Sequence, residues 1–180
     1  MLLTEVVTTS QAVAATRSRT KKIAALADLI TRLAPEEVVA VVGMLVAAPH
    51  QGRLGVGWST LGRIEAGPAT QPELSVADVD ALFTALAQTS GAGSTATRQS
   101  LLDSAFARTT ELERPFLMGV LMGEVRQGAL ESLLGDAVAL ATGASTELVR
   151  RAWMLTGSLT ETARLAVSGG EPALSAVRLQ

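Results

Sequence analysis

Residues 119–143, GVLMGEVRQGALESLLGDAVALATG, contain two apolar stripes of helical spacing on either side of a glycine-rich turn. The first stripe ends near Gly123 and the second begins at Leu130, which predicts a helix, a tight turn and a second helix. In the turn, Gly128 would allow close backbone approach, and Arg126 would stand beside the positive end of the following helix. Such a turn suits a phosphate oxygen. On this stretch alone, a plain helical hairpin with a solvated Arg126 is the simpler interpretation.

The composition predicts an all-α protein with one core, or two small lobes that share one. Hydrophobic residues make up 48% of the 180 residues, whereas aromatic residues make up only 3%, which is typical of close-packed helices. No stretch approaches the roughly 20 apolar residues that span a bilayer, and no basic export signal follows Met1. The absence of cysteine fits a reducing cytosol, and the single His50 has no histidine partner. We therefore expect a cytoplasmic protein without a membrane partner or a metal site.

The net charge of −2 argues against a nucleic-acid partner, but the charges are unevenly distributed. The first third of the chain has an excess of basic residues, namely Arg17, Arg19, Lys21, Lys22, Arg32, Arg53 and Arg63. The stretch from Glu65 to Asp80 has no basic residue at all. Cations at the start of the helix predicted from about Arg19 to Leu33 oppose the helix dipole unless an anion binds nearby. A solvated basic turn is the alternative.

The helix-turn-helix arrangement occurs twice, at about residues 18–64 and 94–143. One offset aligns the first two helices of each unit, in the pairs Ser18–Ser94, Ile30–Phe106, Glu37–Glu113 and Gly43–Gly119. After five extra residues around Pro49, a second offset aligns the turns, in the pairs Gly52–Gly123 and Gly57–Gly128. The sequence thus predicts a pseudo-twofold domain of two helix-helix-turn-helix units, whose turns would suit the two backbones of a duplex.

A second candidate phosphate cradle is the stretch 89–95, TSGAGST, in which glycines alternate with hydroxyl residues before a helix that carries Arg98. It is not a P-loop, because the G-K-[ST] ending is missing and no strand precedes it. A plain linker is the alternative.

Beyond residue 143, Ser145 should cap one helix, and Ser158 should open the last helix through a capping box with Glu161. Residues 171–180 should begin a linker.

Four short motifs, taken in order, resemble the N-terminal DNA-binding domain of bacterial, actinobacterial-type ATP-dependent DNA ligases. They are RLGVG at 53–57, TSGAGST at 89–95, GEVRQGA at 123–129 and LTGSL at 155–159, and the resemblance covers nearly the whole chain. It implies an all-helical, pseudo-twofold, monomeric domain that grips the minor groove of nicked duplex DNA without reading its sequence. In the family, a nucleotidyltransferase domain with a K-x-D-G lysine and an OB-fold domain follow. Glu124 and Gln99 depart from the family, because many members have basic residues at those positions.

The resemblance implies a set of nucleic-acid-binding residues. They are Arg53, Gly55, Gly57, Gly91, Gly93, Ser94, Thr95, Thr97, Arg98, Gly123, Arg126 and Gly128. The arginines would neutralise phosphates, the glycines would allow backbone approach or supply positive φ, and the hydroxyls would donate hydrogen bonds. The expected function is positioning of a nick, in DNA repair, replication or recombination, for catalytic domains outside this chain.

The resemblance implies no catalytic residue in this chain. The only lysines are Lys21 and Lys22, and neither begins K-x-D-G, so ATP and Mg²⁺ would serve the full-length enzyme rather than this chain. The expected partners are duplex DNA, at the nucleoid, and the protein's own catalytic domains. The alternative from another class is an α-helical protein-interaction module, which the acidic pI and the scarcity of lysine favour. A free-standing enzyme comes third, because no nucleophile and base can be assembled from one histidine and scattered acids.

Overall fold

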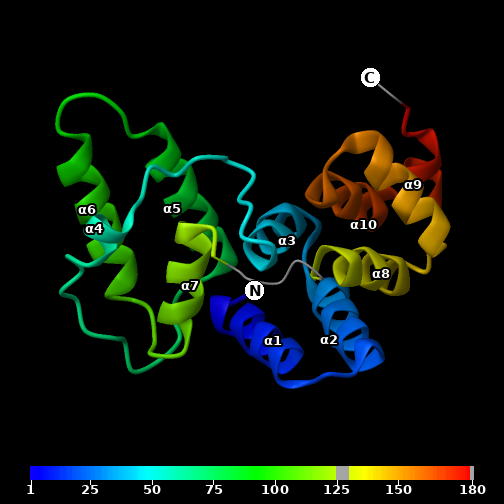
Figure 1. Cartoon of the computed structure of the whole chain (residues 1–180), viewed down its shortest axis with the longest axis horizontal. Coiled ribbons are helices and arrows are strands. Elements are labelled where there is room, and N and C mark those ends of the chain that lie inside the picture. The colour runs from blue at the N-terminus through cyan, green and yellow to red at the C-terminus, as the bar shows by residue number, and fades with distance from the viewer. Residues whose placement is uncertain (125–129, 179–180) are drawn as a thin grey trace.

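The structure is a computed structural model that describes residues 1–124 and 130–178, and its regular elements are helices (Figure 1). They are α1 (Leu3–Ala15), α2 (Arg19–Arg32), the 3-10 turn η1 (Pro35–Glu37), α3 (Val38–Leu45), α4 (Trp58–Leu61), α5 (Val76–Gln88), α6 (Ser94–Phe106), α7 (Glu113–Met122), α8 (Leu130–Thr142), α9 (Thr146–Thr156) and α10 (Leu159–Ala176). Within these residues, β pairing is limited to an isolated bridge between Leu2 and Ser75. The predicted all-α class is confirmed.

The helices form two lobes around a continuous hydrophobic core. In Figure 1, α4 to α7 lie on the left, α8 to α10 on the right, and α1 and α3 between them. The most extensive helix pairing is that of α2 with α8, while α1 contacts both α2 and α7 and so connects the lobes. None of the helices in residues 1–124 and 130–178 combines the length and apolarity needed to cross a bilayer.

Serine residues fix the starts of several helices, as predicted. Ser145 Oγ accepts the backbone N–H of Leu148 at 3.2 Å, and Ser158 Oγ accepts that of Glu161 at 3.2 Å. A capping box would also have the Glu161 carboxylate accept the backbone N–H of Ser158. That part of the prediction is wrong, because this carboxylate instead binds the guanidinium of Arg164 at 2.6 and 2.8 Å. A bidentate charge-assisted pair one turn along the helix is stronger than a single contact with a backbone N–H.

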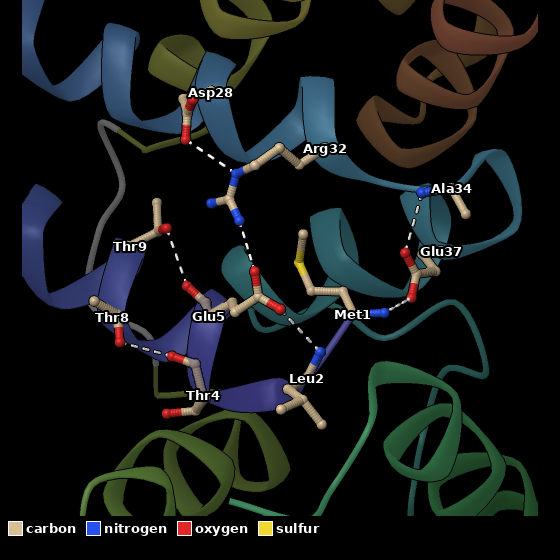
Figure 2. A network of polar contacts seen from close by, with 10 residues as sticks. All are labelled: Met1, Leu2, Thr4, Glu5, Thr8, Thr9, Asp28, Arg32, Ala34 and Glu37. Atoms are coloured by element: carbon tan, nitrogen blue, oxygen red, sulfur yellow. Dashed lines mark hydrogen bonds and ion pairs between the residues drawn. The ribbon is translucent and has the colours of Figure 1, made fainter.

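The N-terminal residues connect α1 to α2 and to η1 through a polar network (Figure 2). The α-ammonium group of Met1 pairs with the carboxylate of Glu37, whose other oxygen accepts the N–H of Ala34 at 3.0 Å. Burial raises the pKa of Glu37, but the ammonium group and the Ala34 N–H outweigh burial and hold this pKa below its usual value. Glu5 binds Arg32 at 2.6 Å and so joins α1 to the end of α2.

Each predicted repeat unit begins with a pair of helices, and the two pairs align with one another. The units also share a contact at aligned positions. Helices α2 and α3 of the first unit align with α6 and α7 of the second. Before α3, Glu37 accepts the N–H of Ala34; before α7, Glu113 accepts the N–H of Thr110 at 2.8 Å. This shared contact supports an internal repeat, whereas the pseudo-twofold relation of the units stays a prediction.

Residues 171–176, which the sequence assigned to a linker, continue α10 beyond a kink at Gly170, where φ is 58° and ψ is −152°. Leu174 is fully buried, and the carboxylate of Glu171 accepts the N–H of Ser145 at 3.0 Å. This part of the chain therefore packs on the domain. Where a connection to a following domain begins stays a prediction.

Candidate nucleic-acid interface

The glycine-rich turn between α3 and α4 exposes the residues that were expected to bind DNA. Buried Leu54 fixes the turn on the core, whereas its neighbours Arg53 and Gly55 are exposed. Gly55 has a φ of +67°, a backbone conformation that strains residues with side chains. Gly57 differs, because its φ is −137° and a Cβ there would meet no atom within 4 Å. The backbone thus requires glycine at position 55, while the space beside Gly57 is open to a ligand.

The Gly/Ser turn between α5 and α6 leaves the start of α6 accessible. Gly91 and Gly93 both have a φ of +80°, and a Cβ at either would meet no atom within 4 Å. Gly93 is the N-cap of α6, so no side chain caps this helix, and its first turn contains no acid. Thr95 and Thr97 are exposed and Ser94 is half-exposed at this helix start. Hydroxyl groups therefore surround a helix end that carries the positive part of the helix dipole.

Arg98 holds these two turns together. One terminal nitrogen of its guanidinium donates to the carbonyl of Thr89, which is the C-cap of α5. The same guanidinium lies against Gly55, where a Cβ would stand 2.9 Å from the Arg98 Cζ. The side chain is partly buried, and its Nε has no hydrogen-bond partner among the described residues. Arg98 thus brings the 51–57 and 89–95 turns into one surface, and a direct contact of Arg98 with phosphate stays a prediction.

The glycine-rich stretch that follows α7 in the second unit is described only up to Glu124. Gly123 has a φ of +69° and ends α7 in a Schellman arrangement, in which the N–H of Glu124 donates to the carbonyl of Gly119 at 2.8 Å. This contact explains the glycine by helix termination. Arg126 and Gly128 lie outside the described residues, so their expected DNA contacts stay predictions.

Most arginine side chains of the described chain already have partners within the protein. Arg19 and Arg150 bind Asp136 at 2.6 and 3.0 Å, Arg32, Arg108 and Arg164 bind other carboxylates, and Arg98, Arg114 and Arg178 donate to backbone carbonyls. Within residues 1–124 and 130–178, the cationic side chains with neither an ion pair nor a hydrogen bond are those of Arg17, Lys21, Lys22, Arg53, Arg63 and Arg151. All but Arg151 lie at the start of α2 or around α4. Both places belong to the first predicted repeat unit, at about residues 18–64.

Sequence reasoning left Lys21 and Lys22 unassigned, and it missed Arg63 as a candidate. A usable signal was present, because no Asp or Glu stands three or four positions away from these cations or from Arg53. Arg32, by contrast, has Asp28 four positions earlier and binds it at 3.1 Å. The described residues form no group of three or more His, Asp and Glu side chains arranged for a metal ion.

The fold and the surface define the class of protein, which is an all-helical domain with exposed cations and glycine-rich turns. Residues 62–139 match the family described as DNA ligase N terminus. The predicted resemblance to the N-terminal domain of an actinobacterial ligase is confirmed.

The similarity to individual relatives extends over the whole chain. Over 180 residues the chain is 49% identical to a protein described as a probable DNA ligase of Rhodococcus jostii (strain RHA1), and 50% identical to a probable DNA ligase of Pseudarthrobacter chlorophenolicus. A probable DNA ligase of Nocardia farcinica (strain IFM 10152) is 48% identical over the same length. These alignments take in 100% of this chain but only 36%, 36% and 34% of the relatives, so the chain spans about a third of their length.

Proposed function

We propose that this chain binds nicked duplex DNA without sequence preference and positions the nick for ATP-dependent sealing by catalytic domains outside the chain. The observation that carries the proposal is the location of the partnerless cations, of which all but Arg151 lie at the start of α2 or around α4 in the described structure. The relatives' description as probable DNA ligases supports the same function. ATP and Mg²⁺ would bind to the catalytic domains.

Phosphate binding in this proposal uses the surface that Arg98 assembles. Arg53 and Arg63 are exposed and without carboxylate partners among the described residues, so they neutralise backbone phosphates without breaking an existing ion pair. The uncapped start of α6, with Ser94 and Thr95, offers backbone N–H and hydroxyl donors to a phosphate oxygen. Arg98 keeps both turns in place.

The second contact region is the start of α2, with Arg17, Lys21 and Lys22. The contact expected of Arg126, which lies outside the described residues, is part of the same proposal. Contacts of this kind address phosphates, which every sequence presents, so they position the protein without reading bases. Gly57 and Gly128 would allow the protein backbone to approach the DNA backbone in the two units. The contact lies on the minor-groove side in this proposal.

Salt dependence tests the proposal. Binding of the chain to nicked and intact duplexes of two unrelated sequences is measured by fluorescence anisotropy between about 50 and 200 mM salt. We expect weak binding, equal for the two sequences, with log affinity falling against log salt by about 0.9 per phosphate contacted. The nicked duplex should bind at least as tightly as the intact one. Absence of binding at low salt, or binding independent of salt, would refute the proposal.

The substitution Arg53→Ala tests the assigned surface. It should lower affinity by a similar factor on both sequences and reduce the salt slope by about 1. Arg151→Ala is the matched control, because Arg151 is also exposed and partnerless among the described residues but lies on α9. An equal effect of the two substitutions on affinity would indicate that DNA binding depends only on net charge. The surface around Arg53 and α4 would then not be the binding site.

A protein-interaction module is the second candidate. Leu140 on α8 is 60% exposed and Met154 on α9 is 81% exposed, and exposed apolar side chains are typical of protein interfaces. Retention of a protein partner by a chain that fails to bind DNA would favour this function.

A further inference from the structure

Trp58 is an exposed aromatic residue within the surface assigned to DNA. It is the first residue of α4, and 59% of its surface is accessible. Leu54 and Leu61, on either side in the sequence, are 6% and 2% exposed, so this segment reaches the core through other residues. Exposing a large indole to water is unfavourable, and the fold gains little packing from Trp58. A ligand that covers this side chain would remove that cost.

The charges around Trp58 identify the chemistry of the ligand. Arg53 precedes it and Arg63 follows it, and neither side chain has a partner among the described residues. The space beside Gly57, the residue before Trp58, is open, since a Cβ there would meet no atom of a residue other than its chain neighbours within 4 Å. An indole with an available arginine on either side of it in the sequence matches a polyanion that has apolar surface between its charges. Duplex DNA has this combination, with phosphates on its edges and deoxyribose and base edges in its grooves.

We propose that Trp58 contacts duplex DNA directly, with its indole against deoxyribose and base edges in the groove, while Arg53 and Arg63 bind the flanking phosphates. This inference rests on the proposed function and adds to it an apolar, sequence-tolerant contact. Apolar and aromatic side chains serve this purpose in other groove-binding proteins, and their contacts release few counterions. They would supply affinity that a protein of net charge −2 cannot obtain from cations alone.

The test measures, for each variant, the DNA affinity and the slope of log affinity against log salt. Trp58→Ala should weaken binding to the nicked duplex about fivefold or more at every salt concentration, and it should leave the salt slope unchanged. Arg53→Ala should instead reduce the slope by about 1. Trp58→Phe should retain part of the affinity. Met154→Ala is the control, because this side chain is also exposed and apolar but lies on α9, and it should change neither quantity.

Tryptophan fluorescence gives a second measurement. Nicked DNA should protect the wild-type protein from acrylamide quenching, and this protection should disappear in Trp58→Phe. The remaining Trp153 is partly buried and packs against Gly135, where a Cβ would lie 3.7 Å from the ring, so it serves as an internal reference.

The possible outcomes separate the two proposals. If the wild-type chain does not bind DNA, the proposed function itself fails. If the wild-type chain binds with the expected salt slope and Trp58→Ala binds equally well, only the assignment of Trp58 is overturned. A loss of affinity in Trp58→Ala accompanied by a changed slope or a lowered melting temperature would also overturn it, because the residue would then act through the fold or the cations.

Discussion

Arg98 depends on the absence of a side chain at position 55. Its guanidinium occupies the space beside the Gly55 Cα, and its hydrogen bond to the Thr89 carbonyl connects the end of α5 to the 51–57 turn. Gly57, two residues later, has neither a positive φ nor a close neighbour. The two glycines of one short motif therefore have different roles, since Gly55 is needed for the fold and Gly57 is available for a ligand.

Substitution of each glycine separates these roles. Gly55→Ala should destabilise the protein by about 1–3 kcal/mol, because alanine is strained at positive φ and its Cβ would displace Arg98. For a chain of this size, each kcal/mol should lower the melting temperature by about 2–4 °C. Gly57→Val should leave the melting temperature unchanged and weaken DNA binding, because its side chain projects into the space that the DNA backbone would enter.

Circular dichroism melting and DNA anisotropy on the same samples check this prediction. Equal melting temperatures for Gly55→Ala and the wild type would contradict the assigned contact with Arg98. Unchanged DNA affinity in Gly57→Val would show that the backbone beside Gly57 does not approach DNA.

At the scale of the element, α5 shows how local caps and long-range contacts combine. The carboxylate of Asp78 accepts the backbone N–H of Ser75 at 2.9 Å, and Ser75 Oγ accepts the N–H of Asp78 at 3.0 Å. Arg108, which follows α6, contacts the same carboxylate at 3.1 Å. The start of α5 is thus held both by its own sequence and by the neighbouring helix.

This cap should make stability depend on pH. The backbone N–H and hydroxyl of Ser75, together with Arg108, lower the pKa of Asp78 despite partial burial. A lowered folded-state pKa means that the unfolded chain binds the proton more readily. The contribution is therefore complete above the ordinary aspartate value of about 4 and is lost as the pH falls through the lowered folded-state value.

The substitution Asp78→Asn should remove this dependence. Urea unfolding of both proteins should give a lower free energy of unfolding for Asp78→Asn at pH 7, and the difference should shrink as the pH approaches 3. Asp28→Asn is the control, because Asp28 is 71% exposed in a pair with Arg32 within the same helix, and it should have little effect. A difference for Asp78→Asn that grows as the pH falls would contradict the assignment.

At the scale of the whole molecule, the two lobes place the available cations in separate regions. The start of α2 lies on the same side of Figure 1 as α8 and α9, whereas α4 lies on the other side, beyond α1 and α3. A ligand that engages both regions must therefore extend across the domain, as a duplex does. The weakly negative net charge does not prevent this, because acids such as Glu161 on α10 pair with arginines outside these two regions.

The chain alone should neither seal DNA nor carry AMP. Incubation with ATP, Mg²⁺ and nicked DNA should give no ligated product and no covalent adenylate, because neither Lys21 nor Lys22 stands in a K-x-D-G sequence. Gel analysis of the DNA and intact-mass spectrometry of the protein provide the measurements. An adenylated lysine detected at position 21 or 22 would contradict the assignment of catalysis to other domains.

The sequence by itself determined the features that depend on neighbours within a few residues. The helical class, the serine caps at Ser145 and Ser158, and the two described glycine turns at Gly55 and Gly91–Gly93 all follow from local spacing and backbone preference. The resemblance to the ligase family followed from short motifs for the same reason, since the motifs at 53–57, 89–95 and 155–159 correspond to turns or helix starts.

Only the tertiary structure decided which polar groups are available to a ligand. Arg19 looked equivalent to Lys21 in the sequence, but Asp136, 117 positions away on α8, binds Arg19. Arg98 joins Gly55 to Thr89, while its expected contact with phosphate stays a prediction, and Trp58 is left exposed. The reason is physical: an ion pair or a buried contact forms where helix packing brings side chains within a few ångströms, and sequence spacing does not determine that proximity between distant segments.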